Sequence, residues 1–183
     1  KGVVIADHTN VVTKQRIMVP ATSDEFNATL LGLQWQWNHN TDNTRWSLTE
    51  RPGYLRLKGN YAKDLLGARN SISQRVQGPA SSGVTLLDYS RLQDGDVAGL
   101  AVFEKPYAYI GVEQKGSKRQ LVMVNDGKKV DSLSLPSAAG PRIWLKATAT
   151  DKGFLADFSY SLDGKVYQVF GNQLVMGLGL SWT

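Results

Sequence analysis

The feature that most constrains this chain is a series of short runs of β-branched and aromatic residues. Gly, Asn, Asp, Ser or Pro interrupts these runs roughly every 8 to 15 residues, which is the spacing of strands and turns rather than of helices. The clearest strands are predicted at residues 54–58, 71–76, 98–103, 107–112, 120–124, 143–148, 154–160 and 166–170. The pattern therefore predicts an all-β chain with almost no helix.

Two of the connections carry the residues that tight hairpin turns require. Asn125-Asp126-Gly127-Lys128 and Leu162-Asp163-Gly164-Lys165 each place Asp-Gly between strand-like runs, where the backbone needs positive φ. Antiparallel neighbours are therefore expected. A dozen or so short strands joined in this way predict a two-sheet antiparallel β-sandwich, of the jelly-roll or concanavalin A-like kind.

The size and composition fit one globular domain. The chain has 183 residues, of which 42% are hydrophobic, and no apolar run approaches the roughly 20 residues of a membrane-spanning helix. Cysteine is absent, which excludes disulfides, thiolate nucleophiles and Cys-ligated metals. We expect a linker-like segment at residues 1–22 and the sandwich at residues 23–183, and no membrane partner.

The net charge of +5 raises the question of an anionic partner. The basic residues, however, occur singly or in pairs such as Lys118-Arg119 and Lys128-Lys129, without a clustered stripe or an RNA-binding aromatic motif. A scattered positive surface is the simpler reading, and no nucleic-acid partner is expected.

Motifs of the common catalytic classes are missing from the sequence. His8 and His39 belong to no metal-binding pair, and the chain contains no Gly-x-Ser-x-Gly elbow, phosphate-binding loop or dinucleotide fingerprint. Glycoside hydrolysis needs two carboxyl groups, yet no Glu-x-Asp-x-x-Glu run projects acids from one strand. The chain on its own is therefore expected to be non-catalytic and to require no cofactor.

A run of alternating tryptophan and amide residues at 31–40 is the best candidate for a binding site. If this run is extended, Trp35, Trp37 and His39 share one face, while Gln34, Gln36 and Asn38 share the other. Flat aromatic rings beside polar donors suit a pyranose ring, whose C–H face packs on an aromatic side chain. The predicted carbohydrate-binding residues are Trp35, Trp37, Asn38 and His39.

Trp144 is a fifth candidate for carbohydrate binding, and the tryptophans at 35 and 37 have an alternative role. Trp144 shares a strand face with Lys146 and Thr148, so it is expected either at a rim or under a covering loop. The alternative for Trp35 and Trp37 is that each fills the core against the opposite sheet, as tryptophan in sandwich strands commonly does.

Several blocks of sequence, taken in order, carry a resemblance to a known family. Leu-Gly-Leu-Gln-Trp-Gln-Trp-Asn-His-Asn at 31–40 and Arg-Pro-Gly-Tyr-Leu-Arg-Leu at 51–57 are the longest of the N-terminal blocks. Others lie at residues 22–26, 46–48, 68–70, 74–75, 78–79, 87–88, 94–100, 110–112 and 158–164. The chain from about Thr22 onward resembles the C-terminal β-sandwich module of glycoside hydrolase family 43 enzymes, the β-xylosidases and α-L-arabinofuranosidases.

The resemblance implies a concanavalin A-like fold and an accessory role in xylan degradation. In this family a catalytic propeller domain carries the acids that cut the glycosidic bond, so the expected partners are that propeller and xylan or xylo-oligosaccharide. The module would bind xylan, complete the propeller's active site, or both; a purely structural role and, more remotely, a glycanase or lyase activity are the alternatives. The family's closing strands are expected to be absent after residue 183, and the location to be extracellular or periplasmic.

Two further groups of residues are predicted on the basis of this resemblance. Asp24 and Glu25 open the sandwich where related modules hold a structural calcium ion; the alternative is that both acids are solvated at a strand entrance. A polar cluster is expected either to complete the active site or to serve the fold, and it comprises Arg51, Arg69, Asn70, Gln74 and Arg75. Arg75 is expected to pair with Asp88 or Asp96, or to open onto a cleft.

Overall fold

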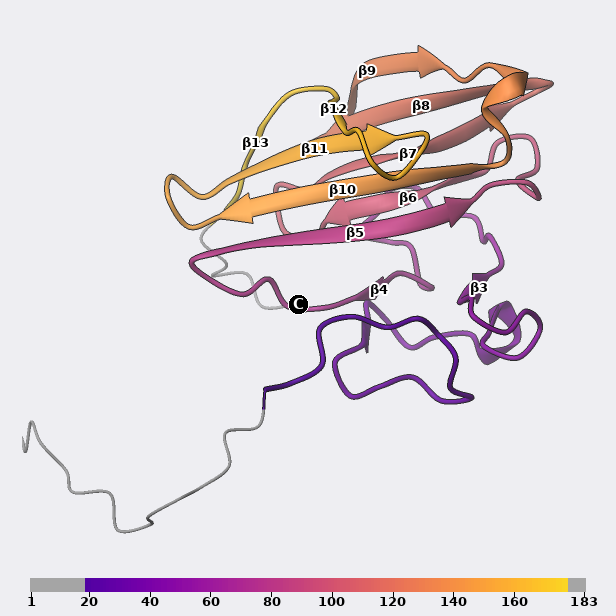
Figure 1. Cartoon of the computed structure of the whole chain (residues 1–183), viewed down its shortest axis with the longest axis horizontal. Helices are drawn as coiled ribbons and strands as arrows, with labels where there is room; N and C mark the ends of the chain where they lie inside the picture. The colour runs from indigo at the N-terminus through magenta and orange to yellow at the C-terminus, as the bar shows by residue number, and fades with distance from the viewer. Residues whose placement is uncertain (1–18, 178–183) are drawn as a thin grey trace, which may run out of the picture.

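The computed structural model describes residues 19–177 and shows two β-sheets packed face to face (Figure 1). The first sheet has the order β12-β11-β10-β5, and β13 also pairs with β11. All its pairings are antiparallel. Its strands are β5 (Ala80–Asp88), β10 (Arg142–Thr150), β11 (Leu155–Ser161), β12 (Gln168–Val169) and β13 (Leu174–Val175).

The second sheet is an antiparallel meander in which every strand pairs with the next one along the chain. Its strands are β6 (Val97–Val102), β7 (Ala108–Lys115), β8 (Lys118–Asn125) and β9 (Lys128–Ser134). A short 3₁₀ turn, η2 (Ser137–Ala139), leads from this sheet back to β10 in the first. Consecutive hairpins of this kind follow from the short turn sequences between the strands.

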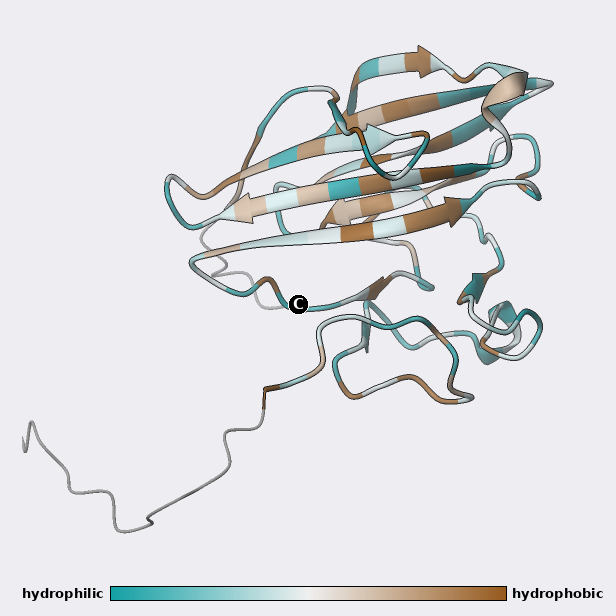
Figure 2. Cartoon of the chain, in the orientation of Figure 1, coloured by the Kyte–Doolittle hydropathy of each residue, from teal (hydrophilic) through white to brown (hydrophobic). Residues whose placement is uncertain are grey.

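The core lies between the two sheets and is built from alternating side chains. On β10, Ile143, Leu145, Ala147 and Ala149 are buried, whereas the residues between them are partly exposed. On β7 and β8 the buried residues that face them include Ile110, Val112, Leu121 and Met123. Figure 2 shows this alternation as brown and teal bands along the strands. Burial of one face of each sheet fixes the register, because a slip of one residue would expose the whole apolar set.

Residues 19–79 form a layer with little regular structure, called here the irregular segment. It lies along the β5 side of the sandwich (Figure 1). It contains one 3₁₀ turn, η1 (Asn43–Arg45), and two-residue strands that pair as β1-β4 and β2-β3. These are β1 (Gln36–Trp37), β2 (Trp46–Ser47), β3 (Arg56–Leu57) and β4 (Ile72–Ser73). Among the described residues, the main core cluster includes no side chain from this segment.

The predicted all-β sandwich is confirmed, and most of its expected strands exist. The strands predicted at 54–58, 71–76 and 166–170 correspond to β3, β4 and β12, introduced above, and each of these observed strands is only two residues long. The predicted strands were therefore too long. Two long strands, β5 and β9, were not predicted. Most of the predicted linker-like segment, residues 1–22, and the end of the chain, 178–183, lie outside the described residues.

Within residues 19–177, no helix is long and apolar enough to cross a membrane. The first predicted Asp-Gly turn is a tight hairpin as expected, whereas the second lies in a longer connection between β11 and β12, in which only its glycine has positive φ. Asp126 and Gly127 have φ of 47° and 75° in the β8–β9 turn, and Gly164 has φ of 73° after β11. These positive values explain why glycine stands in both turns.

Gly164 also packs directly on an aromatic ring, which gives a test of the fold. A Cβ atom at this position would lie 2.8 Å from Cε2 of Trp144, in addition to the strain of positive φ. Gly164→Ala should therefore lower the free energy of unfolding in urea by roughly 1–3 kcal/mol. Gly83→Ala is the control, because a Cβ at Gly83 meets no atom within 4 Å. Equal stability of both variants would contradict this role of Gly164.

Candidate functional site

Trp37 of β1 and Trp35 just before it face other aromatic side chains of the irregular segment. The Trp35 ring stacks on Phe26 at 5.5 Å between centroids, and its indole N–H donates to Asp24 Oδ2 at 2.9 Å. Trp37 packs on Trp46 at 5.2 Å. Both tryptophans are half-buried. Neither fills the core between the two sheets, and both hold the irregular segment together.

Asn38 and His39 bind the backbone of a neighbouring loop. The Asn38 side-chain amide donates to the carbonyls of Leu66 and Ala68, at 3.1 and 3.3 Å. His39 Nε2 also bonds to the Leu66 carbonyl, at 2.9 Å. These side chains thus fasten the loop before β4 to the strand that β4 pairs with, β1.

Trp144 lies on a different sheet from the other predicted sugar-binding residues. It is on the outer face of β10, where the turn containing Gly164 covers part of its ring. The predicted covering by a loop is therefore what the structure shows. Beside it, Lys146 lies over the ring of Tyr167 at 5.6 Å. The structure does not bring Trp144 together with Trp35 and Trp37.

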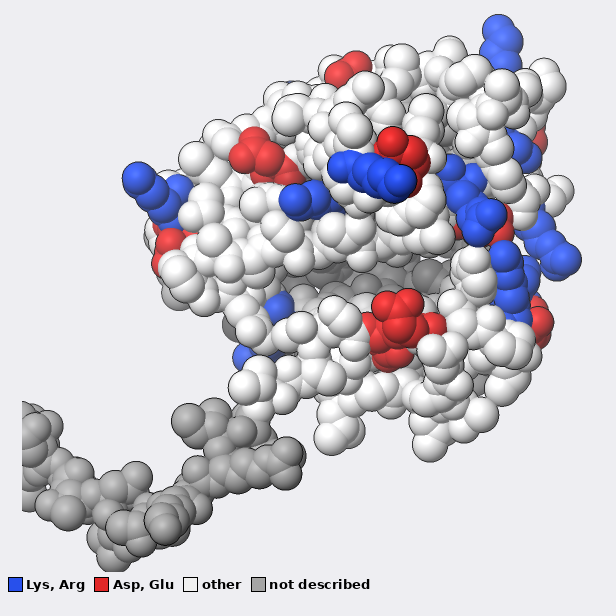
Figure 3. Space-filling view, viewed as in Figure 1, with Lys and Arg blue, Asp and Glu red and all other residues white. Residues whose placement is uncertain are grey.

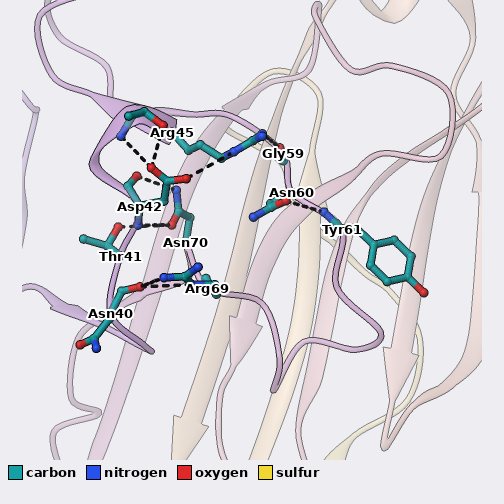
Figure 4. A network of polar contacts seen from close by, with 10 residues as sticks. Asn40, Thr41, Asp42, Arg45, Gly59, Asn60, Tyr61, Arg69 and Asn70 are labelled. Carbon is teal, nitrogen blue, oxygen red and sulfur yellow. Dashed lines mark hydrogen bonds and ion pairs between the residues drawn. The ribbon is translucent and has the colours of Figure 1, made fainter.

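The predicted polar cluster separates into three places. Arg69 and Asn70 belong to the network in Figure 4. Arg69 donates twice to the Asn40 carbonyl, and Asn70 Oδ1 accepts from Thr41 Oγ1 and from the Asp42 backbone N–H, each at 3.2 Å. Asp42 in turn caps η1, and hydrogen bonds from Thr44 lower its pKa. Arg69 and Asn70 therefore serve the fold of the irregular segment.

Arg51 joins the irregular segment to the sandwich. Its guanidinium donates to Asp88 Oδ2 at 2.6 Å and lies over the Tyr54 ring at 3.7 Å. Burial alone would raise the pKa of Asp88, but hydrogen bonds from Arg51 and Ser90 outweigh it and lower that pKa to about 2. The pairing of Arg75 with Asp88 was wrong, because Arg51 occupies that carboxylate.

Arg75 and Gln74 instead line a small open concavity on the irregular segment, which we call the glutamine concavity. Its volume is about 180 Å³. Its lining includes Leu33, Gln34, Gln36, Gln74, Arg75 and Gln77. Of these, the sequence reasoning selected only Gln74 and Arg75. The alternation at 31–40 separated Gln34 and Gln36 from the tryptophans on the assumption of an extended run, but only Gln36 and Trp37 form a strand and Gln34 lies in a turn.

A second concavity of about 180 Å³ lies at the turn after β11, lined by Tyr160, Ser161, Leu162, Asp163, Val166 and Gln168. Its polar groups bind one another. Asp163 Oδ1 accepts from Ser161 and from the backbone of Lys165 and Val166, which lowers the Asp163 pKa, and Tyr160 donates to Gln168. Because these polar groups already bind one another, this concavity has few free hydrogen-bonding groups for a ligand.

Within residues 19–177, the predicted calcium ligands Asp24 and Glu25 belong to no cluster of three or more acidic or histidine side chains. Asp24 Oδ1 accepts the Phe26 backbone N–H at 2.8 Å, and Oδ2 accepts the Trp35 indole N–H. No group of three or more His, Asp or Glu side chains that could hold a metal ion occurs in residues 19–177. Calcium takes six to eight oxygen ligands, so the two carboxylates alone would supply only part of a coordination shell.

Residues 23–179 match the family described as the β-xylosidase C-terminal concanavalin A-like domain. The chain belongs to this family. It is 31% identical over 194 residues to a β-xylosidase of Formosa agariphila, in a match that covers 91% of the chain and 31% of that enzyme.

Solved structures of GH43 proteins share the fold of this module. A bifunctional GH43-CE protein of Bacteroides eggerthii has a TM-score of 0.80 at 36% identity, covering 86% of this chain and 21% of that chain. An engineered GH43 glycoside hydrolase with endo-xylanase and exo-arabinofuranosidase activity has a TM-score of 0.80 at 31% identity, covering 90% and 36%. The module thus spans about a third or less of the relatives that it matches.

The Arg51–Asp88 pair predicts how the stability of the module depends on pH. Because folding lowers the Asp88 pKa from 3.8 to about 2, the pair stabilises the fold above about pH 4, and this contribution is lost as the pH falls toward 2. Arg51→Gln should reduce the loss of unfolding free energy between about pH 4 and 2.5, measured by urea denaturation. Arg75→Gln removes an equal charge without a carboxylate partner and should keep the wild-type profile. An unchanged profile in Arg51→Gln would contradict the assignment.

The predicted calcium site can be tested by measuring the melting temperature of the chain with and without calcium. Because both Asp24 oxygens already accept N–H donors, we expect the melting temperature to stay the same after treatment with a chelator and after addition of calcium. Differential scanning calorimetry would detect the change. A rise in melting temperature with calcium but not with magnesium would restore the calcium prediction.

Proposed function

We propose that this module is a non-catalytic accessory part of a xylan-degrading GH43 glycosidase, of the β-xylosidase or α-L-arabinofuranosidase type, and that its partner is a catalytic propeller domain. The observation that carries the proposal is the family match over residues 23–179, together with the small share of each relative that the chain covers. We expect such an enzyme to act on polysaccharide outside the cell or in the periplasm.

The carboxyl groups support a non-catalytic role. Glycoside hydrolysis needs a general acid whose pKa is raised, next to a second carboxylate. Where the pKa of a described carboxyl group shifts, it shifts downward, as in Asp42, Glu50, Asp88 and Asp163. Each of these carboxylates accepts hydrogen bonds from, or pairs with, side chains that hold the fold. They are structural anions rather than proton donors.

Two roles within such an enzyme remain, and different observations favour them. The glutamine concavity presents amide groups and one guanidinium to solvent, which favours contact with polysaccharide. The irregular segment also exposes large apolar side chains, with Leu30 at 79% and Tyr61 at 93% exposure, which favours packing against the catalytic domain. The two roles are compatible, because they use different side chains of one segment.

A chimeric enzyme tests the accessory role. The part of the Formosa agariphila β-xylosidase that matches this chain would be replaced by the chain itself. We expect the chimera to keep kcat/KM on an aryl β-xyloside within about tenfold of the parent enzyme, and the isolated chain to be inactive. Hydrolysis by the isolated chain would contradict the proposal, as would a folded chimera no more active than the enzyme without its matching part.

The same chimera tests the packing role. Tyr61→Ser should lower its melting temperature by a few degrees and leave that of the isolated chain unchanged, because Tyr61 is exposed in the module alone. Val169→Ser is the control, since Val169 is 80% exposed but lies outside the irregular segment. Equal effects of the two substitutions in the chimera would argue against docking through Tyr61.

A further inference from the structure

The glutamine concavity lies beside β1 and the chain that follows β4. Trp37 of β1 packs on Trp46, and Trp35, just before β1, stacks on Phe26, while Gln36 of β1 and Gln34 in the turn before it line the concavity. The chain directly after β4, the partner of β1, adds Gln74, Arg75 and Gln77 to the same concavity. Two segments far apart in sequence therefore place five polar side chains around one hollow.

The amide side chains of this concavity lack partners that most other glutamines of the module have. Gln93, Gln114, Gln168 and Gln173 each form a side-chain hydrogen bond within the protein. Within residues 19–177, the side chains of the four glutamines in the concavity form none. An amide carries both a donor and an acceptor, so the concavity offers the groups that bind vicinal hydroxyls.

Arg75 is also unlike the other arginines of the irregular segment. Arg45, Arg51 and Arg56 contact carboxylates, and Arg69 donates to a backbone carbonyl. Among the described residues Arg75 has neither kind of partner, and the lining of the concavity contains no acidic side chain. The concavity therefore carries one uncompensated positive charge among neutral amides. A guanidinium in that state suits a carboxylate, which it can bind through two parallel hydrogen bonds.

We infer that the glutamine concavity binds an acidic sugar unit of a substituted xylan, with its carboxylate on Arg75 and its hydroxyl groups on the glutamine amides. The volume of about 180 Å³ is below the roughly 300–1,000 Å³ of sites that enclose a whole drug-sized ligand. It therefore suits one sugar unit of a chain that continues into solvent. The exposed Leu33 adds an apolar surface for the C–H groups of the sugar. The inference rests on the proposed xylan-type function and specifies its ligand.

Figure 3 agrees with a local rather than a general attraction for anions. Basic and acidic side chains are mixed over the face that it shows, without a continuous positive surface on that face. An acidic polysaccharide would therefore be selected at one site instead of being held by the net charge of the molecule.

The experiment is a calorimetric titration of the whole chain with two xylo-oligosaccharides of equal backbone length, one neutral and one carrying a glucuronic acid branch. The acidic ligand should bind roughly fivefold to tenfold more tightly, and this preference should shrink between about 50 mM and about 500 mM NaCl. Arg75→Gln should abolish the preference without changing the melting temperature, because Arg75 is exposed. Arg142→Gln, which removes another exposed arginine outside the concavity, should retain it.

The amides are tested by Gln36→Ala combined with Gln74→Ala, which should weaken both ligands, whereas Gln93→Ala should weaken neither. Equal affinity for the two ligands would overturn the inference, as would a preference that survives in Arg75→Gln. Failure of the folded chain to bind either ligand would overturn it as well. None of these results changes the outcome of the chimera experiment, so failure of the site and failure of the accessory role are distinguishable.

Discussion

The ion pair between Arg51 and Asp88 links the irregular segment directly to the sandwich. The two sheets hold each other through a shared apolar core, to which residues 19–79 contribute no side chain among those described. The segment must therefore be attached by individual contacts. Arg51 reaches across to the end of β5, and Asp88 is only 14% exposed there, so the pair works where water screens it less than at an open surface. The candidate site lies entirely on the part of the chain that this contact helps to place.

The sandwich could be predicted wherever local sequence carries the signal. Each Asp-Gly turn, and the alternation along β10, is contained in a short stretch of sequence, and these signals were found. Strand β5 begins Ala-Ser-Ser-Gly, which lacks β-branched side chains. Every residue of β9 is exposed, so β9 shows no alternation between an inner and an outer face. Both strands exist because neighbours pair with them, and pairing between distant strands is not visible in a short window of sequence.

The site was predicted less well for a related reason. Alternation at residues 31–40 separates two sets of side chains, but it does not tell which set faces inward. Trp35 and Trp37 pack on Phe26 and Trp46 within the irregular segment, and not in the core between the two sheets. Arg51 and Asp88 are separated by 37 residues, and only the fold could show that this pair, rather than one with Arg75, forms.

The exposed strand β9 has a consequence for how separate copies of the module behave. It closes one side of the second sheet, and within residues 19–177 it pairs with no strand other than β8. A bare strand of this kind is a template on which another molecule can extend the sheet. Here Lys128, Lys129 and Asp131 place charges along it, and the register with β8 shifts between Met123 and Val124. Charges and irregular pairing are two devices that disfavour intermolecular sheet formation, so this border of the fold protects the module against aggregation.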